Sequence, residues 1–181
     1  MADLIEHFEV ESEELYSDAT FDDKCQIIIP EFQAIYEELI QHFAYHPEDL
    51  HNLEWRKFER LLDAIFKNQG FVSEIGPGSG DSGVDLRLIQ KANVGELVTL
   101  VQAKRYAPKY PIQLEPVAAL LGVMYDQNAD RGLFVTTSCY LPSAKKFAER
   151  QKKLLTLAAS EDVGKWCREI VVARAHRGKG C

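Results

Sequence analysis

Cysteine is scarce in this sequence and widely scattered. Among the 181 residues, Cys25, Cys139, Cys167 and Cys181 are the only cysteines, and no two of them form a CxxC pair. This spacing argues against a zinc ribbon and against a disulfide framework. We therefore expect buried or spectator thiols that stay reduced.

Long apolar runs and chain-breaking residues are also few. No apolar run approaches the roughly 18 residues of a membrane-spanning helix, and glycine and proline number only 11 and 7. Collagen-like, wholly disordered and membrane-spanning classes are therefore excluded. The first fifteen residues lack the basic start and apolar core of a signal peptide, which predicts a cytoplasmic protein.

The net charge of −7 is unevenly distributed along the chain. Residues 1–50 hold 14 acidic residues against one lysine, whereas residues 144–181 hold 10 basic residues against four acidic ones. Without its first fifty residues the chain is net basic, which favours nucleic acid as a partner. The acidic segment is interpreted as an arm that competes with phosphates for the basic surface or docks a partner subunit.

Hydrophobic periodicity predicts an N-terminal arm and helix over residues 1–46 and a main domain over residues 47–181. The main domain begins with a helix, continues with three strands, and then alternates helices and strands. The expected order is α-β-β-β-α-β with further α/β elements, which predicts an α/β fold with a mixed sheet flanked by helices. Expected helices cover 30–46, 53–68, 112–127, 143–153 and a segment from 161, and expected strands cover 71–75, 84–89, 97–104, 132–136 and 154–157.

Two short patterns have ordinary explanations. Residues 78–83, GSGDSG, match the dinucleotide-binding GxGxxG pattern, but the residues after them alternate like a strand instead of opening a helix. A tight connection between strands explains them better. His42 and His46 lie one helical turn apart and are able to share a metal, but without a third ligand an ordinary helix surface is favoured.

Three polar residues on two neighbouring predicted strands form a candidate site. Asp85 alternates with apolar residues on the first strand, and Gln102 and Lys104 share one face of the second. If these strands pair as a hairpin, an acid, an amide and an ammonium group converge at its open end. Such a set suits metal-assisted phosphodiester hydrolysis, with Mg²⁺ or Mn²⁺ held by the oxygens. A solvated strand face with an Asp–Lys pair is equally compatible with the spacing.

Several segments together resemble the Mrr-type restriction endonuclease domain, a branch of the PD-(D/E)xK nuclease superfamily. The resemblance covers roughly residues 47–157. It implies a restriction-endonuclease-like core and a metal-dependent DNA endonuclease of bacterial defence. The segments that carry it are LEWRKFERLL at 53–62, GF at 70–71, GDSGVDL at 80–86, VQAKRY at 101–106 and FVTTS at 134–138.

The resemblance also implies roles for individual residues. Asp85 is expected to bind the metal, Gln102 takes the position of the usual second acid, and Lys104 is the catalytic lysine. Glu59 matches a glutamate on the first core helix of related nucleases, although an ion pair with a neighbouring arginine or lysine is the competing interpretation. The backbone carbonyl of Ala103 is a further expected ligand. Because Gln102 is neutral, it lowers the charge of the site.

Double-stranded DNA is the expected partner, and a homodimer or an activating subunit is a further possibility through the acidic N-terminal region. The basic and aromatic side chains expected at the phosphates provide affinity without sequence specificity. Two other functions stay open on the sequence alone: an inactive binding module of the same fold and a structure-specific DNA resolvase. The expected DNA-contacting residues are Lys104, Arg105, Tyr106, Lys109, Lys145 and Lys146.

Overall fold

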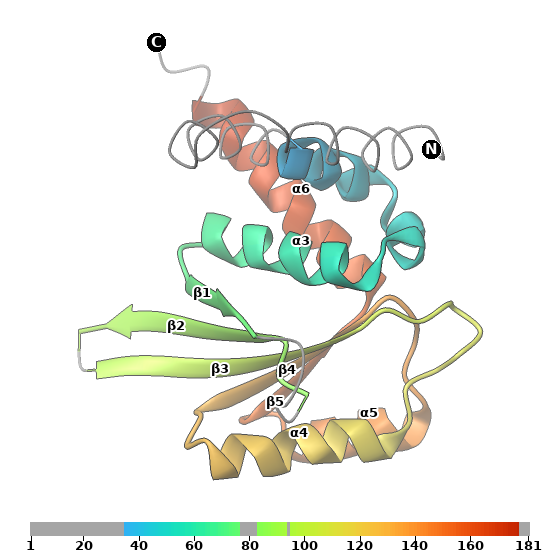
Figure 1. The fold of residues 1–181 in the computed structure, drawn as a ribbon, viewed down its shortest axis with the longest axis vertical. Coiled ribbons are helices and arrows are strands. Elements are labelled where there is room, and N and C mark those ends of the chain that lie inside the picture. Colours follow the sequence, from blue (N-terminus) through green and yellow to red (C-terminus); the bar gives the residue numbers. More distant parts are fainter. Residues whose placement is uncertain (1–34, 77–82, 94, 178–181) are drawn as a thin grey trace, which may run out of the picture. The chain divides into compact units, whose positions relative to one another are not determined.

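The computed structural model describes residues 35–76, 83–93 and 95–177 (Figure 1). The chain divides into two compact units, residues 1–37 and 38–181, and every named element lies in the second unit. The predicted domain boundary at residue 46 stays a prediction, and residues 35–45 are helical as expected. The acidic arm over residues 1–29, the glycine-rich segment over 78–82, Cys25 and Cys181 lie outside the described residues.

A single five-stranded mixed sheet forms the centre of the second unit, in the order β1-β2-β3-β4-β5. The first three strands pair antiparallel, and β3, β4 and β5 pair parallel. The predicted α/β fold with a mixed sheet is confirmed. The strands are β1 (Val72–Ile75), β2 (Leu86–Ala92), β3 (Gly95–Lys104), β4 (Arg131–Thr136) and β5 (Leu155–Ala158).

Helices cover both faces of this sheet (Figure 1). Helices α3 (Trp55–Asn68) and α6 (Ser160–Arg177) lie on one side, and α4 (Leu114–Asp126) and α5 (Pro142–Arg150) lie on the other. Parallel strands need a crossover between them, and α4 and α5 provide the two crossovers. The short 3₁₀ helix η1 (Pro47–Asn52) precedes α3.

Helix α3 has a defined start and one apolar stripe. The Glu54 carboxylate accepts hydrogen bonds from the N–H groups of Arg56 and Lys57, which satisfies two of the free donors at the helix start. Phe58 and Leu62 are buried one turn apart, on the face that packs onto the sheet. This stripe fixes the rotation of α3 and therefore the direction of the buried Glu59 beside it.

The opposite face of the sheet carries a second apolar cluster, formed with α4 and α5. Phe134 on β4 and Leu100 on β3 are fully buried there. The Tyr140 hydroxyl lies 2.7 Å from the Phe134 carbonyl oxygen and 2.8 Å from the Ala158 carbonyl oxygen. It therefore links the ends of β4 and β5 within the core, where an unpaired hydroxyl would be costly.

The two cysteines of the described ranges, Cys139 and Cys167, are free thiols. Burial raises the pKa of Cys167 to about 12, so this thiol is inert at neutral pH. Within the same ranges, no helix combines the length and the apolarity that crossing a membrane requires.

Two helical glycines provide a matched test of this packing. A Cβ atom on Gly164 in α6 would lie 2.7 Å from Pro47 Cβ, whereas one on Gly122 in α4 would meet no atom of the described residues within 4 Å. We expect Gly164→Ala to lower the free energy of unfolding by about 1–3 kcal/mol through overpacking. Gly122→Ala should raise it by about 0.5–1 kcal/mol, because alanine favours the helix. Urea unfolding measures both, and equal stability of the two variants would contradict the packing of α6 on η1.

Candidate active site

Asp85 lies where the antiparallel pairing of β2 and β3 ends. The last pair of the ladder is Leu86 with Val101. One residue earlier in the chain, the Asp85 N–H donates to the Val101 carbonyl oxygen at 2.8 Å, and Asp85 Oδ2 accepts from the Ala103 N–H at 2.7 Å. The backbone of β3 therefore fixes the direction of this carboxylate. The predicted hairpin is present, and Asp85 lies at its open end.

Gln102 precedes Ala103 on β3, and its side chain is buried. The residue is 9% exposed, and its Oε1 atom has no hydrogen-bond partner among the described residues. The amide nitrogen packs against Gly83, where an added Cβ atom would overlap Gln102 Nε2. Gly83 also has φ +83°, a conformation that favours glycine. The last glycine of the GxGxxG pattern thus makes room for the Gln102 amide.

Glu59 approaches Asp85 from α3. It is 3% exposed, and its carboxyl group lies close enough to Asp85 for the charge of that residue to act on it. Burial raises the pKa of Glu59, and the neighbouring charge of Asp85 raises it further, although Arg56 acts in the opposite direction. The structure therefore brings together a pair of acids that disfavours full ionisation.

Arg56 forms an ion pair with Glu59. Its Nη1 atom donates to Glu59 Oε2 at 2.8 Å, and its guanidinium carbon lies 4.6 Å from the centroid of the Trp55 ring. The ion pair that the sequence offered as the competing interpretation of Glu59 is thus present, together with the contact to Asp85. The two interpretations do not exclude each other.

Lys104, the next polar residue of β3, has a firmly held backbone. Its carbonyl oxygen accepts from the Thr136 hydroxyl at 2.7 Å and from the Thr137 N–H at 3.2 Å. Lys104 itself is partly buried and lies two residues after Gln102. The spacing in the sequence indicated Asp85, Gln102 and Lys104. It did not indicate Thr136, at the end of β4, and Thr137, directly after it, which fix the end of β3 from more than 30 residues away.

The residues expected to contact DNA fall into two groups. Arg105, Tyr106 and Lys109 are exposed on the segment that follows β3, directly after Lys104. Lys145 and Lys146 are exposed on α5, on the other side of the sheet from α3. Their role at DNA stays a prediction.

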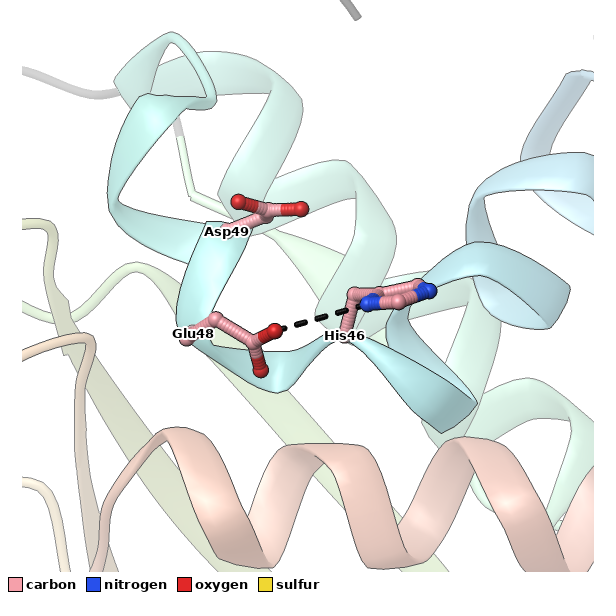
Figure 2. Close-up of side chains that lie close together, drawn as sticks. All are labelled: His46, Glu48 and Asp49. Carbon is pink, nitrogen blue, oxygen red and sulfur yellow. Dashed lines mark hydrogen bonds and ion pairs between the residues drawn. The ribbon is translucent and has the colours of Figure 1, made fainter.

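A second group of possible metal ligands, His46, Glu48 and Asp49, lies at η1, and Figure 2 shows it. One ligand atom from each lies within 4.8 Å of the others. His46 Nδ1 is 3.4 Å from Glu48 Oε1, and His42 Nε2 is 3.1 Å from Asp49 Oδ2. Each imidazole is thus paired with a carboxylate, and these contacts account for the proximity of the side chains without a bound ion. The two acids were not apparent from the sequence because the turn at Pro47 brings them beside the histidines.

Comparison with known proteins places this site in a family. The family model described as restriction endonuclease, Mrr_cat, matches residues 50–167, which is more than half of the chain. The chain belongs to the Mrr-type restriction endonuclease family. The matched residues include Glu59, Asp85, Gln102 and Lys104. The resemblance seen in the sequence is therefore confirmed.

Individual relatives of this Mrr-type chain are distant and longer. The uncharacterized protein y4cE of Sinorhizobium fredii is 27% identical over 138 residues, which is 76% of this chain and 35% of that protein. The chain thus spans about a third of the length of this curated relative.

Two solved structures share the fold. The DNA modification-dependent restriction endonuclease AspBHI superposes with a TM-score of 0.56 at 18% identity, over 72% of this chain and 35% of that one. The MspJI restriction endonuclease, solved with a 27-mer oligonucleotide, superposes with a TM-score of 0.50 at 21% identity, over 76% of this chain and 31% of that one.

The raised pKa of Glu59 predicts a pH dependence of stability. As pH rises above the usual glutamate range and through the raised pKa, the unfolded chain releases the proton more readily, so the free energy of unfolding falls. In EDTA, Glu59→Gln should lack the pH-dependent contribution of Glu59 to the free energy of unfolding. The stability of this variant relative to wild type should therefore increase with pH and then level off. Urea unfolding between pH 4 and 8 measures it.

Glu169→Gln, which changes an exposed residue of α6, is the control and should follow the wild-type curve. Parallel curves for wild type and Glu59→Gln would show that Glu59 ionises as it does in the unfolded chain.

Proposed function

We propose that this domain hydrolyses phosphodiester bonds of DNA with a divalent cation, Mg²⁺ or Mn²⁺. The observation that carries the proposal is the buried Oε1 atom of Gln102, which has no hydrogen-bond partner among the described residues. Gln102 directly precedes Ala103, whose N–H donates to the Asp85 carboxylate. A buried polar atom without a partner is costly, and an oxygen of this kind is a ligand that Mg²⁺ accepts.

The carboxyl pair supports the same assignment. Burial and the neighbouring charge of Asp85 raise the pKa of Glu59, and a cation held by both carboxyl groups would favour their ionised forms. We assign Asp85, Glu59, Gln102 and the Ala103 carbonyl as the groups that would hold it. When bound, a divalent cation supplies Lewis-acid chemistry toward a phosphoryl oxygen and a more acidic water.

The chain's own residues perform the remaining work in this proposal. Lys104 orients the attacking water or stabilises the negative charge that develops on the phosphate, and its backbone is held for this by Thr136. The hydrogen bond from Ala103 keeps the Asp85 carboxylate in one direction, which limits the reorganisation needed during the reaction.

DNA binding and biological role belong to the same proposal. Arg105, Lys109, Lys145 and Lys146 are exposed cations that suit contacts with phosphates. MspJI, which shares the fold, was solved with an oligonucleotide, and AspBHI is named as acting on modified DNA. We infer a role in cytoplasmic defence against foreign DNA, in which the acidic N-terminal region or a partner subunit restrains activity.

Plasmid nicking tests the function. With Mg²⁺ the wild type should convert supercoiled DNA to the open circle, and EDTA should stop it. Asp85→Ala and Lys104→Ala should each lower the rate by at least about 100-fold, because each removes a group that acts on the reacting phosphate. Asp126→Ala and Lys91→Ala, at exposed positions on α4 and β2, are the matched controls. Equal rates for wild type and both site variants would refute the assignment.

Substitutions of Gln102 separate a ligand from a packing residue in the same assay. Gln102→Glu adds an anionic oxygen and should lower the Mg²⁺ concentration needed for half-maximal nicking, whereas Gln102→Leu should abolish nicking. Full activity of Gln102→Leu would mean that this amide does not bind the cation.

A further inference from the structure

The segment between β3 and α4, residues 105–113, exposes two tyrosine rings. Tyr106 is 45% exposed and Tyr110 is 58% exposed. The Lys109 ammonium lies 5.1 Å from the centroid of the Tyr110 ring. Since neither residue is buried, capping of the core does not explain them. Exposed aromatic rings beside cations are typical of binding surfaces.

The backbone of this segment is held in place by buried residues. The Tyr106 N–H donates to Thr137 Oγ1 at 3.0 Å, and the Thr137 hydroxyl donates to the Tyr106 carbonyl oxygen at 2.8 Å. The Ser138 hydroxyl donates to the Tyr110 carbonyl oxygen at 2.8 Å. Thr137 is 4% exposed and Ser138 is 8% exposed. Both rings therefore project from fixed points, which lowers the entropy lost when a ligand binds.

Position and charge favour nucleic acid as the ligand. The segment starts directly after Lys104, contains Arg105 and Lys109, and has no acidic residue up to Gln113. Arg105 Nη1 donates to the His51 carbonyl oxygen at 3.3 Å, which also ties the start of the segment to η1. Cations that follow a phosphate backbone, together with aromatic rings that take successive bases, are the parts of a single-strand binding surface.

We propose that Tyr106 and Tyr110 stack on unpaired bases, so that this domain binds DNA that is single-stranded or locally opened beside the cleaved phosphate. In an intact duplex each base is already stacked on its neighbours, and the two rings would meet only sugar and phosphate. An unpaired base offers a free π face to each ring. This inference rests on the proposed nuclease function and names the form of DNA that the site takes.

Fluorescence anisotropy with the full chain tests it. The probes are a labelled oligonucleotide of about 15 nucleotides and the duplex of the same sequence, in Ca²⁺ to limit cleavage. We expect Tyr106→Ala and Tyr110→Ala each to weaken single-strand binding about tenfold and duplex binding less than twofold. Tyr106→Phe and Tyr110→Phe should bind as the wild type does, because they keep the ring. The slope of affinity against salt should not change, since no phosphate contact is lost.

Tyr125→Ala is the matched control, because this tyrosine on α4 is 70% exposed and lies outside the segment. Thermal unfolding of each variant should coincide with the wild type. Unchanged single-strand affinity of the alanine variants would overturn the proposal, and so would an equal loss for single strand and duplex. Plasmid nicking by the wild type in Mg²⁺ is measured in parallel. Nicking without an effect of the tyrosines refutes only the stacking, whereas stacking without nicking refutes only the nuclease function.

Discussion

The contact between Glu59 and Asp85 is the constraint on which the rest of the candidate site depends. Two acids from different elements meet where solvent is largely excluded, and burial raises the pKa of Glu59. Such a pair is stable only with a proton, a cationic side chain or a metal ion between or beside its oxygens. Arg56 provides part of this compensation at 2.8 Å. The Oε1 atom of Gln102, which has no hydrogen-bond partner among the described residues, is the observation on which our proposal of a bound cation rests.

Three features of the fold position the residues of the candidate site. The apolar stripe of α3 sets the rotation of Glu59, the end of the β2–β3 ladder sets Asp85, and the lack of a side chain at Gly83 leaves room for the Gln102 amide. Thr136 at the end of β4 and Ser138 just after it then hold the end of β3 and the segment beyond it. These hydrogen bonds therefore position both the lysine proposed for catalysis and the tyrosines proposed for base stacking.

Local patterns in the sequence predicted the sheet and most of the site, because alternation and helical spacing are local properties. Asp85 and Gln102 were placed on neighbouring strands by a period of two, and Gly95 with φ +93° lies between the predicted strands 84–89 and 97–104. Strand β2 starts at Leu86 and not at Val84, because the Ala103 N–H of β3 donates to the Asp85 side chain and not to a backbone carbonyl before Leu86. Contacts between distant segments left no such pattern. The hydrogen bond from the Thr137 hydroxyl to the Tyr106 carbonyl oxygen, which joins residues 31 positions apart, exists only in the folded chain.

The pKa of Glu59, followed by carbon-13 NMR of its carboxyl group with and without Mg²⁺, tests the central claim most directly. In EDTA the pKa should lie above that of an ordinary glutamate, because of burial and the neighbouring Asp85. Saturating Mg²⁺ should lower it, since a cation favours the ionised form. Gln102→Leu should need a higher Mg²⁺ concentration for the same change. A pKa that Mg²⁺ leaves unchanged would show that the two carboxyl groups do not hold a cation.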